Sequence, residues 1–111
     1  MTDIRHIYDV TDDLIDVIKD TEEYKRYKET LREVKMWPEL KEKIDDFRAE
    51  NFIIQTVVED NHLVEAVENF EKKYEGFRSD KRVNDFLKSE LAFNRLMQEI
   101  YDQIMDGIEY E

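Results

Sequence analysis

Hydrophobic side chains recur every three or four residues along almost the whole chain, which is the period of an amphipathic α-helix. The first stripe contains Val10, Leu14 and Val17, with mainly acidic residues between them. Asp20 stands where an N-cap would begin the next helix, and Glu23, three residues later, would complete a capping box. The pattern therefore predicts one amphipathic helix, a tight turn and the start of a second helix.

A second apolar stripe runs from Tyr24 to Val34, and its charge is opposite to that of the first. Acidic residues dominate positions 9–23, whereas basic residues outnumber acidic ones over positions 24–36. The helix should end before Pro38, because the residue that precedes a proline avoids the helical conformation. We expect the first two helices to pack as an antiparallel hairpin with complementary flanks, although both charged faces could also be solvated without meeting.

The longest stripe steps by three and four residues from Leu40 to Asn61, in the manner of a coiled-coil seam. After Asn61 the phase slips, and a new series continues from Leu63 to Phe77. Asn and Asp side chains compete with the helix for backbone hydrogen bonds. The pattern predicts a long third helix that is bent or broken near residues 59–62, and it leaves both alternatives open.

The last helix is delimited by residues that favour helix ends. Gly76 is a predicted C-cap, and Asp80 follows as a candidate N-cap. The final stripe runs from Val83 to Ile108, and Gly107 should end the helix.

Composition supports an all-α fold, since the 111 residues include only two glycines and one proline, too few for the turns that a sheet needs. The chain is short enough for one core. We therefore predict a single helical domain over residues 1–111. It consists of an antiparallel helical hairpin, one long helix that is continuous, bent or broken, and a C-terminal helix, in a bundle that self-associates.

Charge and residue content exclude several functional classes. The 29 acidic and 17 basic residues give a net charge of −12, which repels a phosphate backbone, so direct nucleic-acid binding is not expected. The absence of cysteine excludes disulfides, thiol catalysis and cysteine-held metal centres. No apolar run approaches the roughly 20 residues that cross a bilayer, and residues 1–6 lack signal-peptide features. We expect a cytoplasmic protein without membrane insertion.

Few residues offer catalytic or metal-binding chemistry. The serines are Ser79 and Ser89 alone, and no recognisable catalytic motif surrounds either histidine. Glu59 and His62 do have the Glu-x-x-His spacing of di-iron bundles, and a homodimer could combine two such pairs with Glu90. A carboxylate-rich metal-binding protein is therefore kept as the alternative, whereas the main prediction contains no catalytic residue, cofactor or metal.

Four polar side chains interrupt apolar stripes: Arg48, Asn51, Glu90 and Asn94. A carboxylate close to a core must be paired, because burying an isolated charge is unfavourable. We predict that Glu90 is mostly buried and contacts Arg48 or Asn51. Such a contact would fix the register of the helices, as a single Asn does in a coiled coil.

The long third stripe has more apolar residues than one face can bury. Five of them lie near residue 55: Phe52, Ile53, Ile54, Val57 and Val58. Exposed apolar area of this kind usually marks a protein–protein surface. We predict a homodimer whose twofold axis crosses this strip, with Ile53 or Val57 near the centre. A higher homo-oligomer is the alternative to the dimer, and contacts with other cytoplasmic proteins are expected in either case.

The order and spacing of these residues resemble the YlbF/YmcA family. Five segments carry the resemblance: Glu23–Tyr27, Trp37–Leu40, Val83–Leu91, Arg95–Ile100 and Gly107–Ile108. Ile44, Phe47 and Arg48 also fit the family pattern, and the whole resemblance extends from about Leu14 to Ile108, which is nearly the whole chain.

The resemblance implies an all-α, self-associating, cytoplasmic bacterial protein without enzymatic activity. Characterised family members act in a complex that influences RNase Y-dependent mRNA processing and, through it, competence, sporulation and biofilm formation. This chain departs from the family at Trp37, where an N-capping Asp is usual, and it lacks the cysteines that hold iron–sulfur clusters in the characterised complex. The resemblance thus implies a non-enzymatic helical adaptor or regulator that acts through protein–protein interaction, without a cluster.

Overall fold

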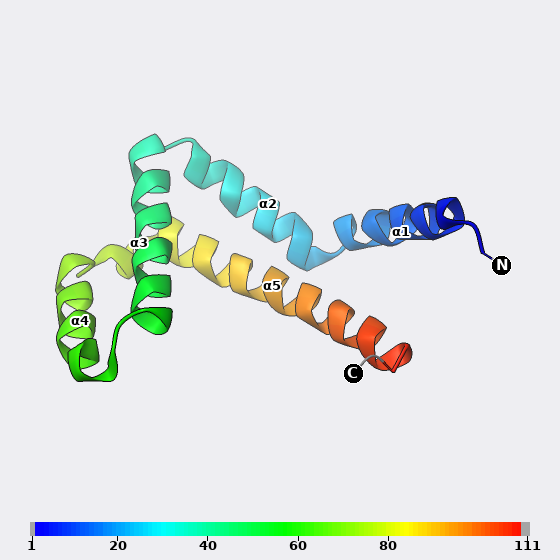
Figure 1. The fold of residues 1–111 in the computed structure, drawn as a ribbon. Helices are drawn as coiled ribbons and strands as arrows, with labels where there is room; N and C mark the ends of the chain where they lie inside the picture. Colours follow the sequence, from blue (N-terminus) through cyan, green and yellow to red (C-terminus); the bar gives the residue numbers. More distant parts are fainter. Residues whose placement is uncertain (1, 110–111) are drawn as a thin grey trace. The chain divides into compact units, whose positions relative to one another are not determined.

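The computed structural model describes residues 2–109, which are almost entirely helical (Figure 1). The elements are α1 (Ile4–Lys19), α2 (Glu22–Lys35), α3 (Pro38–Thr56), α4 (Asp60–Lys73), the 3-10 turn η1 (Phe77–Ser79) and α5 (Lys81–Gly107). No strand occurs within this described range. The predicted all-α class is confirmed.

Most of the predicted helix ends agree with the structure. Pro38 is the first residue of α3, and Gly107 is the last residue of α5. The C-cap of α4 is Tyr74, two residues before the predicted Gly76, which has a left-handed φ of 76°, a conformation that glycine adopts without a Cβ clash. The Asp80 carboxylate accepts a hydrogen bond from the Arg82 backbone N–H at 2.9 Å and so caps the start of α5.

The start of α2 differs from the prediction by one residue. Asp20 terminates α1 and does not cap α2; its carboxylate lies 3.2 Å from Lys25 Nζ. The Thr21 hydroxyl instead accepts a hydrogen bond from the Tyr24 backbone N–H at 3.2 Å and donates to the Ile18 carbonyl at 2.6 Å. Thr and Asp both serve as N-caps, so the sequence alone does not show which of the adjacent residues Asp20 and Thr21 caps α2.

The predicted long helix is broken, and the two pieces are α3 and α4. Val57 is the C-cap of α3, and Glu59 adopts an extended conformation immediately before α4. Figure 1 shows α4 running back beside α3. The phase slip in the apolar stripe therefore marks a reversal of chain direction, which begins slightly before the predicted residues 59–62.

The chain divides into two compact units. Unit 1 contains residues 2–30 and 88–109 of the described range, and unit 2 contains residues 31–87. The division falls within α2 and within α5, so each of these helices contributes residues to both units. Folding of residues 1–111 as a single domain remains a prediction.

Unit 2 has a hydrophobic core. Its buried apolar residues are Val34, Ile44, Phe47, Tyr74, Phe77, Val83 and Phe86. The centre of the Phe47 ring lies 5.1 Å from that of Phe70 and 5.2 Å from those of Tyr74 and Phe77. Aromatic pairs of this kind stabilise by about 0.5–1.5 kcal/mol beyond their buried area. The cluster joins α3 to α4 and η1.

Unit 1, in contrast, buries no hydrophobic side chain within its described residues. Its two buried residues are polar: Thr30 and Ser89, whose hydroxyls share a hydrogen bond of 2.5 Å. Half-buried Tyr24 and Tyr27 pack against the ring of Phe93, with centroid distances of 5.7 and 5.3 Å. These rings form an apolar contact between α2 and α5 in this unit.

Helix α1 has no buried residue, although it is amphipathic. Ile18, near its end, is half-buried, and the rest of the helix is exposed. The antiparallel hairpin predicted for α1 and α2 is therefore not confirmed. Complementary exposed charges contribute only about 0.2–1 kcal/mol per pair, which is too little to hold a helix that lacks apolar contacts.

Candidate interaction surfaces

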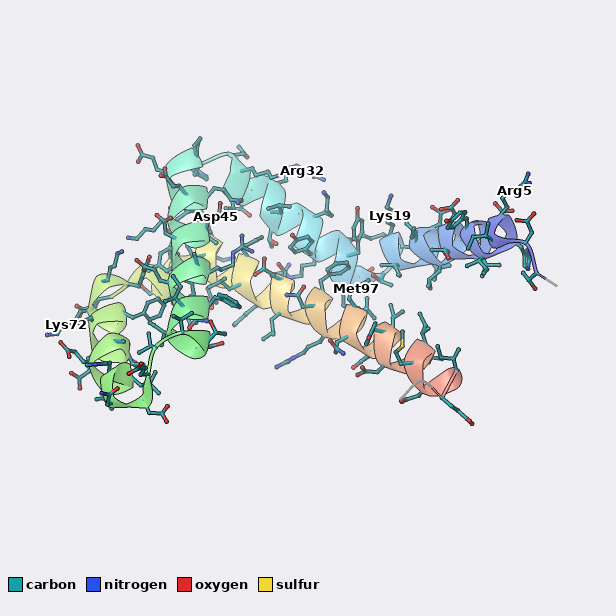
Figure 2. The ribbon with its side chains drawn as sticks, viewed as in Figure 1. Arg5, Lys19, Arg32, Asp45, Lys72 and Met97 are labelled. Atoms are coloured by element: carbon teal, nitrogen blue, oxygen red, sulfur yellow. The ribbon has the colours of Figure 1, made fainter. Side chains whose placement is uncertain are left out.

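An apolar face of α1 is open to solvent. Its exposed large hydrophobic residues are Ile4, Ile7, Tyr8, Val10, Leu14, Ile15 and Val17. Their exposed fractions range from 37% at Leu14 to 65% at Val17. Figure 2 shows side chains projecting from this helix between the labelled Arg5 and Lys19. The sequence pattern identified the stripe, but it could not show that the chain leaves it uncovered.

The half of α5 that belongs to unit 1 exposes a second apolar face. Met97, Tyr101 and Ile104 recur along one side of the helix, Ile108 follows directly after it, and Leu91 is exposed on another side. From position 98 to 109 this segment contains acidic residues and no basic one. Unit 1 thus carries two apolar faces, and both are flanked by negative charge.

The predicted strip at the end of α3 is also exposed, but it is smaller. Phe52 (63% exposed), Ile53 and Val57 are exposed, whereas Ile54 and Val58 are half-buried. The structure thus leaves these side chains accessible, and their role as an interface stays a prediction.

The four predicted register residues are not buried in the single chain. Arg48, Asn51 and Glu90 are half-buried, and Asn94 is exposed. The Gln55 amide donates weakly to the Asn51 side-chain oxygen at 3.5 Å, within α3. Contact between Glu90 and either predicted partner remains a prediction.

Arg48 is engaged within unit 2. Its Nη2 donates to Asp45 Oδ1 at 2.7 Å, and its guanidinium lies 5.7 Å from the centre of the Phe86 ring. Lys41 Nζ also donates to both oxygens of Asp45 at 2.7 Å. The hydrogen bond from Lys41 and then that from Arg48 lower the pKa of the Asp45 carboxyl. The Asp45 carboxylate therefore stays ionised, with hydrogen bonds from Lys41 and Arg48, and it is a poor candidate for acid–base catalysis.

A second polar group joins α3 and α4. Lys73 Nζ bonds the Glu50 carboxylate, and this contact, with the neighbouring Tyr74 hydroxyl, lowers the pKa of Glu50. Burial, followed by the proximity of Glu50, raises the pKa of Tyr74 to about 12. Tyr74 therefore remains protonated at neutral pH, so this cluster stabilises the helix pair and does not supply a base.

A cavity of about 420 Å³ opens beside the same helices. Phe47, Val67, Phe70 and Tyr74 contribute its apolar and aromatic walls, and Arg78 lies on its lining with its guanidinium 5.0 Å from the Phe47 ring centre. Asn51, Glu71 and Ser79 add polar groups to the lining, so the cavity is partly apolar and partly polar.

The structure gives the metal-binding alternative no support. Glu59 and His62 are neighbours at the start of α4, where the His62 backbone N–H donates to the Glu59 carbonyl at 2.9 Å, and both residues are exposed. Within residues 2–109, no three His, Asp or Glu side chains form a group that could hold a metal ion. The same search range contains no helix with the length and apolar character needed to span a membrane.

Comparison with known proteins identifies the family. Residues 7–109 match the family described as control of competence regulator ComK, YlbF/YmcA. A relative from Caldicellulosiruptor bescii, named UPF0342 protein, is 23% identical over 110 residues, which cover 97% of this chain and 92% of the relative. No solved structure shows a significant match. Because the family match covers nearly the whole chain, the resemblance is confirmed, and the chain belongs to the YlbF/YmcA family.

Proposed function

We propose that this chain is a non-enzymatic regulatory adaptor that acts by binding other proteins in the cytoplasm. The family description, which concerns the control of a regulator, supports a regulatory role. The observation that carries the proposal is the exposed apolar surface on both units, away from the side chains that form the core of unit 2. Contiguous exposed apolar surface usually marks a site of protein interaction.

The strip formed by Phe52, Ile53, Ile54, Val57 and Val58 is the proposed docking site for a regulatory partner. Stable interfaces bury about 20–30 residues on each side, and five neighbouring side chains fall well short of that. The strip suits a small, reversible contact, which is what an adaptor needs in order to release its partner.

An adaptor of this kind influences RNA processing through proteins and not by contacting RNA. The net charge of −12 opposes direct contact with phosphate groups. If the RNase Y-dependent role of characterised relatives extends to this chain, its partner belongs to the protein machinery that cleaves or delivers the transcript.

Purifying the proteins that bind this chain in its native cell tests whether the strip is a docking site. The tagged wild type, Ile53→Asp and the control Val64→Asp are cross-linked in cells, purified and compared by quantitative mass spectrometry. Val64 is 70% exposed on α4, outside the strip, so its substitution adds the same charge at an unrelated site. We expect the wild type and Val64→Asp to capture the same partners and Ile53→Asp to lose them about tenfold. If all three proteins bound the same partners in equal amounts, the strip would not be the docking site.

Two further measurements separate an adaptor from the metal-binding alternative. Deletion of the gene should change the abundance of RNase Y-dependent transcript fragments, and expression of the wild type should restore them, whereas Ile53→Asp should not. Elemental analysis of the dialysed protein should find no stoichiometric iron, manganese or zinc. A retained equivalent of any of these metals would favour the alternative built on Glu59, His62 and Glu90.

A further inference from the structure

The cavity beside α3, α4 and η1 has the size of a small-molecule site. Its volume of about 420 Å³ lies within the range of about 300–1,000 Å³ that ligand pockets occupy. Such pockets combine apolar and aromatic walls with a few polar groups that orient the ligand. Every residue on the lining belongs to unit 2, so the cavity is complete within one compact unit. The chemistry of its walls therefore indicates what it can bind.

Three aromatic rings line the cavity. The ring centres of Phe70 and Tyr74 lie 5.0 Å apart, and both lie within 5.2 Å of the Phe47 ring centre. Phe47 and Tyr74 are buried, whereas Phe70 and Val67 are half-buried and so retain apolar surface that a ligand can cover. Aromatic rings favour a further ring in an offset or edge-to-face arrangement. The walls thus favour an aromatic ligand over an aliphatic one.

A cation lies on the lining beside these rings. The Arg78 guanidinium lies over the Phe47 ring, 5.0 Å from its centre, and makes no ion pair with a carboxylate within residues 2–109. A guanidinium that contacts a ring keeps N–H donors for other partners, and their fork geometry matches the two oxygens of a carboxylate. The cavity therefore combines an aromatic wall with a group that binds an anion.

The chain around Arg78 is well fixed. Gly76, with its left-handed φ of 76°, leads into η1, and the Phe77 ring is buried. On the other side of Arg78, the Ser79 hydroxyl donates to the Gly76 carbonyl at 2.6 Å. A site that is ordered before binding loses less conformational entropy when the ligand arrives. The turn thus presents Arg78 to the cavity without a large rearrangement.

The other polar groups on the lining limit the charge of the ligand. Glu71 lies on the same lining as Arg78, and the whole chain carries −12. Both oppose a second negative charge, so a phosphate dianion or a nucleotide is disfavoured. A single carboxylate is the anion that one arginine can neutralise. Asn51 and the oxygen of Ser79 add neutral groups for hydrogen bonds.

We infer that this cavity binds a small aromatic monocarboxylate. The aromatic ring of the ligand packs against Phe47, Val67 and Phe70. Its carboxylate accepts hydrogen bonds from the Arg78 guanidinium. The ligand thereby joins α3, α4 and η1 at a site that is separate from the docking strip.

Titration with cinnamate, followed by NMR, tests whether the cavity is a binding site. In protein with isotope-labelled valine methyl groups, the cinnamate ring should shift the Val67 signals with a dissociation constant of about 1 mM or tighter. Val64 is the internal control, because it lies 70% exposed on the same helix and outside the lining. No saturable shift of Val67 at tenfold higher concentration, or an equal shift of Val64, would overturn the inference.

Uncharged cinnamamide tests the role of the carboxylate. It should bind the wild type about tenfold more weakly than cinnamate, since hydrogen bonds between charged groups are the stronger ones. Arg78→Gln should weaken cinnamate binding about tenfold and leave cinnamamide binding unchanged. Arg32→Gln is the matched control, because it removes the same charge from an exposed position on α2, labelled in Figure 2, outside the lining. Equal binding of the two ligands to the wild type, or equal effects of the two substitutions, would overturn the inference.

Two observations keep these results independent of folding and of the proposed function. The single Trp37, which packs with Arg82 in unit 2 at 4.9 Å, reports by fluorescence that unit 2 remains folded in each variant. Failure of cinnamate to bind would leave the docking strip unaffected, since partner binding is assigned to Ile53, which is not on the cavity lining.

A short peptide separates a small molecule from a protein C-terminus as the natural ligand. Acetyl-Gly-Gly-Phe also joins an aromatic ring to a carboxylate. We expect it to bind no more tightly than cinnamate, because its flexible backbone loses conformational freedom on binding. Binding more than tenfold tighter than that of cinnamate, with the same dependence on Arg78, would show a site for protein C-termini and overturn the small-molecule assignment.

Discussion

Units 1 and 2 are built from similar amphipathic helices, but they treat their apolar faces differently. In unit 2 the chain reverses after α3, so that α4 and η1 cover it and seven hydrophobic residues are buried. In the described part of unit 1 none is buried, and the contact that is fully removed from solvent is the hydroxyl pair of Thr30 and Ser89. The difference shows that an amphipathic stripe specifies a helix but not what covers it.

The two units should also differ in how stable they are in a monomer. The aromatic cluster around Phe47 needs only residues of unit 2, so this unit should keep its structure in a monomer. The exposed apolar faces of α1 and α5 form no such core within the described part of unit 1, so this unit should be the less stable of the two in a monomer.

Hydrogen exchange should reveal the largest difference between the units. In the dilute monomer we expect the α1 amides to exchange with an opening free energy close to zero. Amides beside Ile44 and Phe47 should approach the global stability of about 5–15 kcal/mol. Mass spectrometry of peptic fragments measures the exchange of both helices, and equal protection of α1 and α3 in the monomer would contradict the comparison.

Truncating the core of unit 2 should have the next largest effect. Phe47→Ala removes a buried ring that contacts three other aromatic rings and should reduce the free energy of unfolding by about 3–5 kcal/mol. Phe52→Ala is the matched control, because it makes the same chemical change in the same helix at a residue that is 63% exposed. Urea denaturation followed by circular dichroism should show little change for the control. Similar losses for both variants would mean that Phe52 is also covered.

Local features of the fold were predictable where one or two residues determine the backbone. Pro38 and Gly107 mark helix ends in the sequence and in the structure, and Gly76 permits the left-handed turn between α4 and η1, because proline and glycine restrict or permit particular backbone angles. The break between α3 and α4 was visible as a phase slip, but not as a chain reversal. That reversal depends on the aromatic contacts of Phe47, which are distant in sequence and leave no periodic signal.

Interaction surfaces were less predictable than helices. The strip at Ile53 was visible because its apolar residues outnumber one helical face. The stripe at Leu14 looked like an ordinary hairpin face, and only the exposure of the whole of α1 distinguishes it. Glu90 and Asn94 illustrate the same limit, since their place in an apolar stripe does not determine how much of each side chain a neighbour covers.

The buried hydroxyl pair offers a smaller test of unit 1. Ser89→Ala removes the hydrogen bond to Thr30 and should reduce stability by about 0.5–1.5 kcal/mol, the net value of a typical hydrogen bond. The Thr30→Val/Ser89→Ala double variant should lose less than the sum of the single variants, because they share that bond. Thr56→Val is the control, since its exposed hydroxyl bonds only the Phe52 carbonyl of its own helix. Perfect additivity would show that the two hydroxyls contribute independently.

The smallest expected effect concerns the ion pair that joins α3 and α4. Lys73 is 60% exposed and Glu50 35% exposed, so Glu50→Gln should reduce stability at pH 7 by only about 0.2–1 kcal/mol. The pKa of Glu50 lies below its usual 4.5, first because of Lys73. Its contribution is therefore fully present above pH 4.5 and is lost as the pH falls through the lowered value.

The difference between the wild type and Glu50→Gln should accordingly shrink on acidification and also in 1 M salt. Urea titrations between pH 3 and 7 measure this difference. Glu71→Gln, which alters an exposed carboxylate of the same helix pair, should follow the wild-type acid dependence. A Glu50→Gln difference that grows on acidification would mean that the carboxylate is held in its neutral form, and that the stability of unit 2 includes a buried acid.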